Sequence, residues 1–177
     1  NLFKETSLQI KKINSDLDDG TNKLLANTVL TFSDLKTNRM TDYKFDLNKF
    51  TNTSGKTGIY VQYAFVRAKK LLNGSSINTS KINLNIADLD ETDLSLIRGM
   101  IKFEYYFNLA LENNEPHHLA DYLYELSNLF NSMYQNQNIL ENKKETVKFN
   151  KLKISEFFIS YSALLMECLG IEPVEKM

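Results

Sequence analysis

Apolar residues recur at every third or fourth position along most of this 177-residue chain, and no segment alternates convincingly between apolar and polar residues. A period near 3.6 residues gathers side chains on one face of an α-helix, whereas a half-buried strand needs a period of two. The spacing therefore predicts an all-α fold. No internal repeat is visible along the chain.

Two shorter helices are expected near the N-terminus, over residues 2–13 and 24–32, the second capped by Thr21 or Asn22. Residues 36–57 show no clear period, which indicates a loop with at most a short helical turn. Longer helical segments follow at residues 59–73 with Gly74 just beyond the end, 92–111 with Thr92 as N-cap, 116–133, and about 142 to 169. We expect a helical bundle of three long helices preceded by two shorter linking helices.

The composition excludes several classes of protein. With 42% hydrophobic and 24% charged residues, wholesale disorder is excluded. A single cysteine, Cys168, excludes a disulfide framework, and its place on an apolar stripe predicts a buried thiol. No apolar run reaches the ~18 residues of a membrane span and no signal peptide opens the chain, so a cytoplasmic protein is expected. Because the chain begins with Asn1 rather than Met, we also expect a part of a longer protein.

Charge is distributed unevenly, although the net charge is only −1. Residues 36–81 hold nine basic and two acidic side chains, a net of +7, whereas residues 82–125 hold two basic and nine acidic ones, a net of −7. Such segregation fits a basic binding face, and it equally fits two solvated faces that partly neutralise each other. Four acidic residues near the expected helix start would complement its dipole: Asp88, Asp90, Glu91 and Asp93.

Two short segments resemble a phosphate-binding loop and a metal site, but neither has the complete pattern of such a site. Residues 54–57, Ser-Gly-Lys-Thr, end like a phosphate-binding loop, but Phe50 stands where that loop needs glycine. His117 and His118 form a possible metal pair, yet adjacent side chains on a helix point about 100° apart. Surface residues at a helix start are the favoured interpretation, so we expect no metal site.

Four residues are spaced to share one helical face: Tyr60, Tyr63, Arg67 and Lys70. Aromatic planes can stack on unpaired bases and cations can meet phosphates, so this face is a candidate for binding single-stranded RNA. The alternative is that both tyrosines fill gaps in the core beside exposed basic residues. A second basic stripe at helical spacing is expected to be a solvated surface: Lys144, Lys148 and Lys151.

Longer stretches of the sequence resemble arginyl-tRNA synthetases. Residues 58–67, Gly-Ile-Tyr-Val-Gln-Tyr-Ala-Phe-Val-Arg, are similar to the Gly-x-Tyr-Leu-Gln-Tyr-Ala-His-x-Arg signature of that family. Further similar segments, in the family's order within residues 24–177, are Asp-Leu-Lys-Thr-Asn-Arg at 34–39, Asp-Tyr-Lys-Phe-Asp at 42–46, Glu-Pro-His-His-Leu-Ala-Asp-Tyr-Leu-Tyr at 115–124, Phe-Asn-Ser-Met-Tyr at 130–134 and Leu-Gly-Ile-Glu-Pro-Val-Glu-Lys-Met at 169–177. Three positions depart from the pattern, namely Phe65 for His, Leu47 for Trp and Lys176 for Arg, so no function is carried over to position 65.

The resemblance implies a helical anticodon-binding bundle in residues 51–177, with residues 1–50 as helices that link it to a catalytic core. It implies recognition of the anticodon stem–loop of tRNA(Arg) as the C-terminal part of an arginine–tRNA ligase, which uses ATP and magnesium. The implied partners are tRNA(Arg) and an upstream catalytic domain of the same chain, without a membrane, and a monomer is expected. The candidate tRNA-binding residues are Tyr60, Gln62, Tyr63, Arg67, Lys70, Tyr134 and Met177.

The catalytic motifs of the family, His-x-Gly-His and a Lys-Met-Ser-Lys-like loop, do not occur in this sequence. We therefore expect no catalytic residue and no cofactor in this chain, and no activity from it alone. One alternative is a helical protein–protein adaptor, which would have no reason to keep the signature-like sequence of residues 58–67. Another is a synthetase of different specificity, which the Tyr-Val-Gln-Tyr-Ala run and the C-terminal Met177 disfavour.

Overall fold

A computed structural model describes residues 1–135 and 138–177, and within them every regular element is a helix, which confirms the all-α prediction. The α-helices are α1 Leu2–Ile13, α2 Asp19–Leu35, α3 Leu47–Phe50, α4 Gly58–Ser75, α5 Glu91–Ile101, α6 Phe103–Asn113, α7 His117–Gln135 and α8 Glu145–Cys168. Short 3₁₀ turns lie at Thr79–Lys81, Ile86–Asp88 and Ile139–Glu141. In the described part of the chain, no helix is long and apolar enough to cross a membrane.

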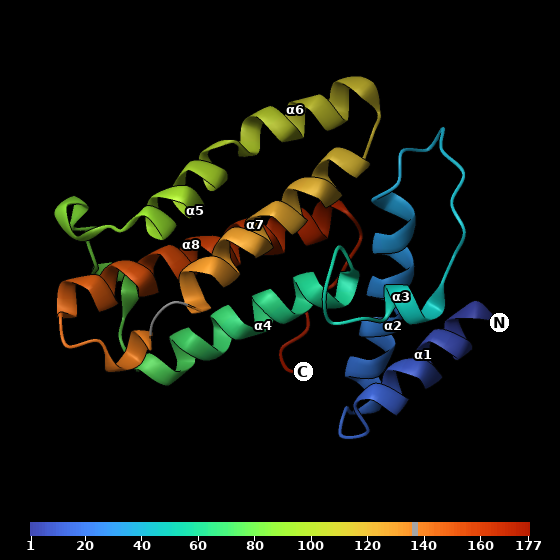
Figure 1. Cartoon of the computed structure of the whole chain (residues 1–177), viewed down its shortest axis with the longest axis horizontal. Coiled ribbons are helices and arrows are strands. Elements are labelled where there is room, and N and C mark those ends of the chain that lie inside the picture. The colour runs from blue at the N-terminus through green and yellow to red at the C-terminus, as the bar shows by residue number, and fades with distance from the viewer. Residues whose placement is uncertain (136–137) are drawn as a thin grey trace.

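The three long helices α4, α7 and α8 run side by side and form the bundle, with α5 and α6 along one side and α1 and α2 at one end (Figure 1). Their apolar stripes meet in one core, where the rings of Phe130 and Phe158 stack with centroids 4.4 Å apart. Burying a large apolar side chain contributes about 1.5–3 kcal/mol. This core therefore supplies the stability that the helices would not have in isolation.

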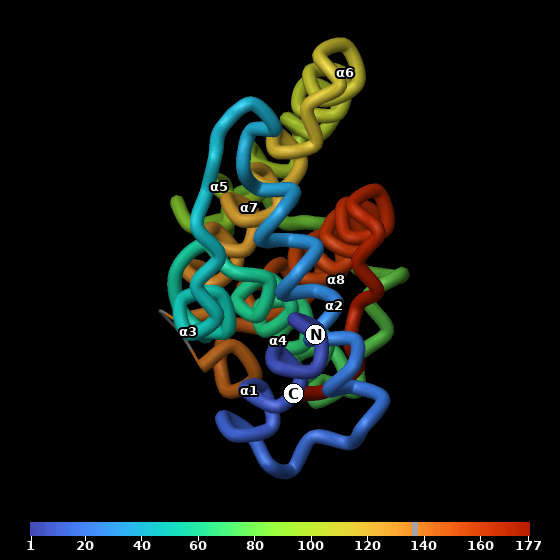
Figure 2. Tube along the Cα trace, turned by 90° about the vertical axis from the view of Figure 1, so that its right-hand side faces the viewer, coloured from blue at the N-terminus to red at the C-terminus, as the bar shows by residue number. Residues whose placement is uncertain are grey.

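The predicted helix over residues 92–111 is wrong as one element, because it breaks at Lys102 into α5 and α6. The buried Tyr122 hydroxyl donates to the carbonyl oxygens of Gly99 and Met100, at 2.8 and 3.2 Å. In an unbroken helix these oxygens would accept from the backbone four residues further on. Helix α6 then diverges and lies at the outer edge of the molecule (Figure 2).

A second core joins the two N-terminal helices to the bundle. Its buried members come from α1, the loop after it, α2, α3, α4 and the C-terminal tail: Ile10, Leu17, Leu25, Ala26, Val29, Phe50, Ile59, Val66 and Val174. Gly58 marks the closest approach of α4 to α2, since a Cβ there would lie 2.7 Å from the carbonyl oxygen of Thr28. The first 50 residues thus pack against the bundle through a shared apolar core.

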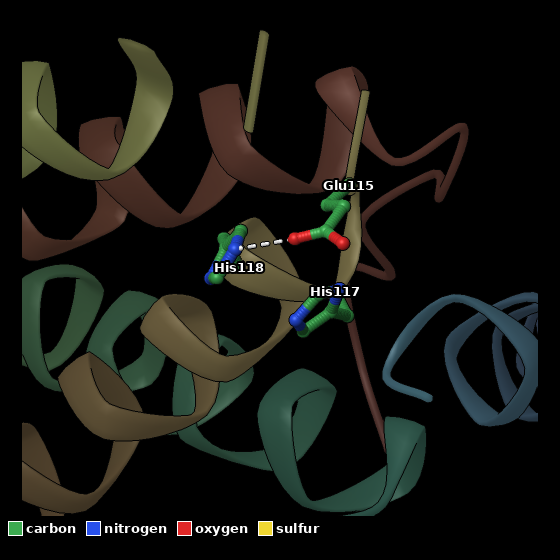
Figure 3. A group of neighbouring side chains, drawn as sticks. All are labelled: Glu115, His117 and His118. Carbon is green, nitrogen blue, oxygen red and sulfur yellow. Dashed lines mark hydrogen bonds and ion pairs between the residues drawn. The ribbon is translucent and has the colours of Figure 1, made fainter. Parts of the chain in front are cut away.

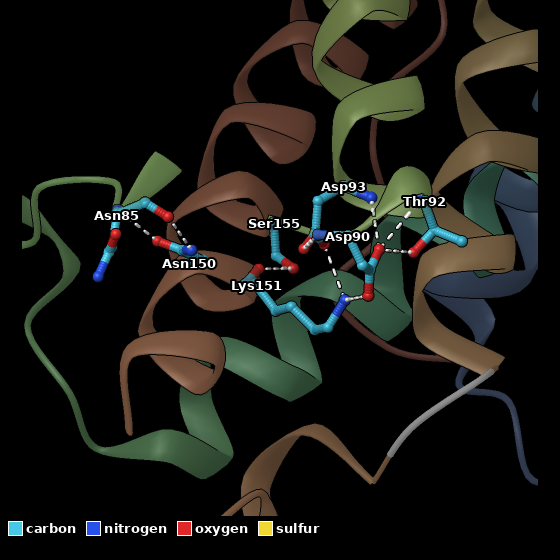
Figure 4. Close-up of polar contacts among 7 residues, drawn as sticks. All are labelled: Asn85, Asp90, Thr92, Asp93, Asn150, Lys151 and Ser155. Carbon is cyan, nitrogen blue, oxygen red and sulfur yellow. Dashed lines mark hydrogen bonds and ion pairs between the residues drawn. The ribbon is translucent and has the colours of Figure 1, made fainter. Parts of the chain in front are cut away.

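Helix α8 carries a buried charge, shown in Figure 4. Lys151 is fully buried, and its Nζ lies 2.8 Å from Asp93 Oδ1 and 2.9 Å from Asp90 Oδ2. The expectation that this lysine is solvated is therefore wrong. Asp90, rather than Thr92, is the N-cap of α5, and it forms a capping box with Asp93. The acidic residues complement the helix start as expected, and they also hold Lys151.

The N-cap of α2 is Asp18, rather than the expected Thr21 or Asn22. Two smaller expectations at the ends of α8 and α4 also differ from the structure. Cys168 is exposed rather than buried, because it occupies the last position of α8, where the chain turns away at Gly170. Gly74 lies inside α4, and the left-handed residue that ends this helix is Ser76, at φ 52°. The apolar spacing located both helices, whereas their ends depend on the turns that follow.

Candidate nucleic-acid interface

Helix α4 positions most of the candidate residues. Its N-cap is Thr57, whose hydroxyl accepts from the backbone N–H of Tyr60 at 3.1 Å and donates to the carbonyl oxygen of Asn52 at 2.7 Å. The neighbouring Lys56 forms an ion pair with Asp121 on α7. Residues 54–57 therefore lead into α4, and the side chains of Lys56 and Thr57 are engaged within the protein.

Arg67 lies between two aromatic rings. Its guanidinium carbon is 4.4 Å from the centroid of the Tyr63 ring and 4.8 Å from that of the Tyr134 ring, on α7. It also donates a 2.7 Å hydrogen bond to Asn131 Oδ1 and a second one to the Tyr63 hydroxyl. Stacking and hydrogen bonding together hold the planar group in one orientation.

Five of the candidates line one cleft of about 150 Å³: Tyr63, Arg67, Lys70, Tyr134 and Met177. Tyr63 is 40% exposed, and Lys70 is exposed with its Nζ 3.4 Å from the backbone oxygen of Met177. We call this group the tyrosine–arginine cleft. It presents aromatic faces and cations to solvent at the same place, which is the combination that binds unpaired bases and their phosphates.

Tyr60 does not face this cleft. Its hydroxyl donates to Asn128 Oδ1 at 2.7 Å, and its ring lies 5.5 Å from the ring of Tyr124. The side chain is half-buried between α4 and α7. For Tyr60, the structure agrees better with the alternative of a tyrosine that fills a gap at the edge of the core.

Gln62 has no exposed surface, so a direct contact with RNA does not fit its place in the structure. Its amide nitrogen donates to Thr28 Oγ1 at 3.0 Å and to the carbonyl oxygen of Glu172 at 2.8 Å, and its amide oxygen accepts from the backbone N–H of Val174 at 3.0 Å. Gln62 thus ties the C-terminal tail to α4 and α2. The tail that Gln62 holds ends at Met177, which lines the tyrosine–arginine cleft.

The tail is held at further points along its course from α8 toward α4 and α1, which Figure 2 shows. Lys69 on α4 pairs with Glu175, and Lys176 pairs with Asp18 at the start of α2. Met177 packs against the second core and lines an apolar cavity of about 320 Å³ with Tyr63. The tyrosine–arginine cleft therefore borders an apolar cavity on this side.

Sequence reasoning missed Asn131, which orients Arg67, and Asn138, which lines a neighbouring cavity of about 400 Å³ with Arg67, Lys70 and Tyr134. Asn131 precedes Tyr134 by three positions on α7, so a search for polar residues on the same helical face would have found it. Asn138 follows the helix, and no periodic signal marks it.

The adjacent histidines are closer than their helical positions suggest. The ring centroids of His117 and His118 lie 4.1 Å apart, and Glu115 joins them, as Figure 3 shows. They are helix-start residues, as expected, but the 100° between adjacent positions on a helix does not keep their rings apart. Both residues belong to α7, so the rings approach each other through their side-chain torsions and not through a departure from the helical backbone.

The segregated charge is partly neutralised inside the fold. Asp88 pairs with Lys144, and the ion pairs of Asp121 and of Asp93 were described above. Acidic groups of residues 82–125 thus contact lysines of α8 and of the segment before α4. The basic residues of the tyrosine–arginine cleft lie apart from these pairs.

Three kinds of comparison identify relatives of this chain. Residues 61–177 match the family described as DALR anticodon binding domain. An arginine–tRNA ligase of Buchnera aphidicola is 32% identical over 155 residues, which cover 88% of this chain and 27% of that protein. An arginine–tRNA ligase of Histophilus somni is 35% identical over 147 residues, which cover 82% of this chain and 26% of that protein.

Solved structures give the same result. The arginyl-tRNA synthetase of Plasmodium falciparum matches 100% of this chain and 33% of its own with 30% identity and a TM-score of 0.84. That of Thermus thermophilus has the same fold, with a TM-score of 0.87 at 23% identity over 99% of this chain and 31% of its own. The chain spans about a quarter to a third of these relatives. It belongs to the DALR anticodon-binding domain family.

Proposed function

We propose that this chain is the anticodon-binding part of an arginine–tRNA ligase and that it binds the anticodon stem–loop of tRNA(Arg). The observation that carries the proposal is the tyrosine–arginine cleft, where Arg67 is fixed between Tyr63 and Tyr134. The family match and the arginine–tRNA ligase relatives support it, and they favour RNA binding over a protein–protein adaptor.

Each residue of the tyrosine–arginine cleft would make a different kind of contact, according to its chemistry. The exposed ring of Tyr63 and the half-buried ring of Tyr134 offer planes for unpaired loop bases, and each such stack contributes about 1–3 kcal/mol. Arg67 fixes the two rings relative to each other, and Lys70 meets the backbone phosphates. Met177 closes the apolar side of the cleft.

The chemistry of the whole ligase would come from an upstream domain of the same chain, with ATP and magnesium. Residues 54–57 do not fit a nucleotide, because the Thr57 hydroxyl caps α4 and Lys56 is paired with Asp121. Residues 1–50 would link that domain to the bundle in 51–177. The ligase would act as a monomer in the cytoplasm, where its tRNA is.

The test measures binding of the purified chain to a labelled RNA hairpin with the tRNA(Arg) anticodon loop, by fluorescence anisotropy. A hairpin with the same stem and a scrambled loop is the control. The proposal predicts tighter binding of the anticodon hairpin, and affinity that falls as salt rises because cations meet phosphates. Equal affinity for both hairpins, or a pull-down that recovers a protein partner without tRNA, would favour the adaptor.

A further inference from the structure

Three potential metal ligands converge where α6 ends and α7 begins. Glu115, His117 and His118 each offer one ligand atom, and these atoms all lie within 4.8 Å of one another. His118 Nε2 is 3.0 Å from Glu115 Oε2, and all three side chains are half-buried. Figure 3 shows the carboxylate directed toward His118, with the ring of His117 beside both.

The backbone fixes this arrangement. Asn114 ends α6 in the left-handed region, at φ 53°, and the N–H of Glu115 donates to the carbonyl oxygen of Ala110 at 2.9 Å. The carboxylate is also held from the other side, because Asn38 Nδ2 donates to Glu115 Oε1 at 3.1 Å.

We propose that Glu115, His117 and His118 bind a divalent transition-metal ion, with Zn²⁺ as the best fit. Two imidazoles and one carboxylate suit zinc better than the oxygen-seeking Mg²⁺ or Ca²⁺. Zinc bonds of about 2.0–2.1 Å in a tetrahedron separate the ligand atoms by ~3.3 Å. The 3.0 Å approach of His118 to Glu115 is already close to that separation.

Binding would exchange one interaction for another. The hydrogen bond between His118 and Glu115 is replaced by two bonds to the ion, His117 turns one ring nitrogen toward the ion, and water takes the fourth position. Because Asn38 stays bonded to Glu115, the ion would hold the segment after α2 against the start of α7. This role is independent of the proposed RNA-binding function.

The experiment uses the whole chain, freed of any affinity tag and of metal. Zn²⁺ is titrated by calorimetry, and Co²⁺ replaces it so that visible absorption reports the coordination. We expect one ion per chain and Co²⁺ bands of low coordination number. The double variant His117→Ala/His118→Ala should lose both signals, whereas Glu112→Ala, an exposed acid on α6, should keep them.

Circular dichroism checks that every variant keeps its helices. The proposal is overturned if the chain binds no Zn²⁺ below about 1 mM. It is equally overturned if the double variant binds as the unaltered chain does. Variants of the tyrosine–arginine cleft should bind the metal normally, so failure of either proposal leaves the other testable.

Discussion

The guanidinium carbon of Arg67 on α4 lies 4.8 Å from the centroid of the Tyr134 ring on α7. This contact joins two helices, and the same guanidinium carbon lies 4.4 Å from the centroid of the Tyr63 ring. Arg67 is therefore more than a positive charge for a phosphate. It sets the spacing of two aromatic planes before any RNA arrives, which reduces the ordering that binding would require.

Replacing Arg67 by Lys should weaken binding of the anticodon hairpin although the charge is kept. Lysine cannot stack as a plane between two rings or donate in the same fork. The loss should be about 2- to 30-fold, equivalent to the ~0.5–2 kcal/mol of a cation–π contact. Fluorescence anisotropy measures it, with Lys70→Arg as the control that keeps charge at a site without stacking. An Arg67→Lys variant that binds as tightly as the unaltered chain would show that only charge matters.

Gln62→Ala should lower the free energy of unfolding by about 2–4 kcal/mol, since it leaves the buried N–H of Val174 and the carbonyl of Glu172 without their partner. Urea unfolding followed by circular dichroism measures the change. Asn73→Ala, at an exposed position of the same helix, should stay within about 0.5 kcal/mol. If Gln62→Ala were equally neutral, the tail would not depend on this side chain.

Lys151→Ala should destabilise the chain by about 3–5 kcal/mol, because Asp93 would remain fully buried without its cation. Lys143→Ala, at an exposed site before α8, is the control and should change stability by about 0.5 kcal/mol or less. Thermal and urea unfolding provide the measurement. Similar stability of the two variants would contradict the role of the buried ion pair.

Stability should also fall in acid, partly through Asp90. Burial raises the pKa of Asp90, but hydrogen bonds from Lys151, Thr92 and the Asp93 backbone outweigh it and lower the pKa to about 2. A carboxyl whose pKa is lower in the folded state contributes stability above its unfolded pKa and loses it as pH falls. The loss should therefore occur between about pH 4 and pH 2.

The matched variant is Asp90→Asn, which keeps a capping side chain but removes the charge opposite Lys151. It should be less stable near pH 5 and lose less stability on acidification than the unaltered chain. Urea unfolding at several pH values compares the two slopes. Parallel pH curves would rule out a contribution from Asp90.

The helices were predictable because each buries one apolar stripe, and this spacing is a local property of the sequence. The break at Lys102 was not, because it depends on Tyr122, which is distant in sequence and takes the carbonyls of Gly99 and Met100. Lys151 was assigned to the surface for a similar reason. Its partners Asp90 and Asp93 belong to another helix, and a stripe of lysines alone does not reveal them.

The candidate site was also predictable only in part. Tyr63, Arg67 and Lys70 share a face because helical spacing requires it, and the family resemblance added Tyr134 and Met177. Spacing could not separate Gln62, which is buried beneath the tail, from its exposed neighbour Tyr63. That difference depends on contacts with residues more than 100 positions away. The RNA contacts themselves stay a prediction.

The most direct test of the account is the affinity of three tyrosine variants for the anticodon hairpin of tRNA(Arg). Tyr63→Ala and Tyr134→Ala each remove one base-stacking plane, so each should weaken binding by about 5- to 150-fold, equivalent to ~1–3 kcal/mol. Tyr105→Ala removes a 64% exposed tyrosine on α6 and should bind as the unaltered chain does. Equal affinity of all three variants and the unaltered chain would contradict the claim that the tyrosine–arginine cleft binds RNA.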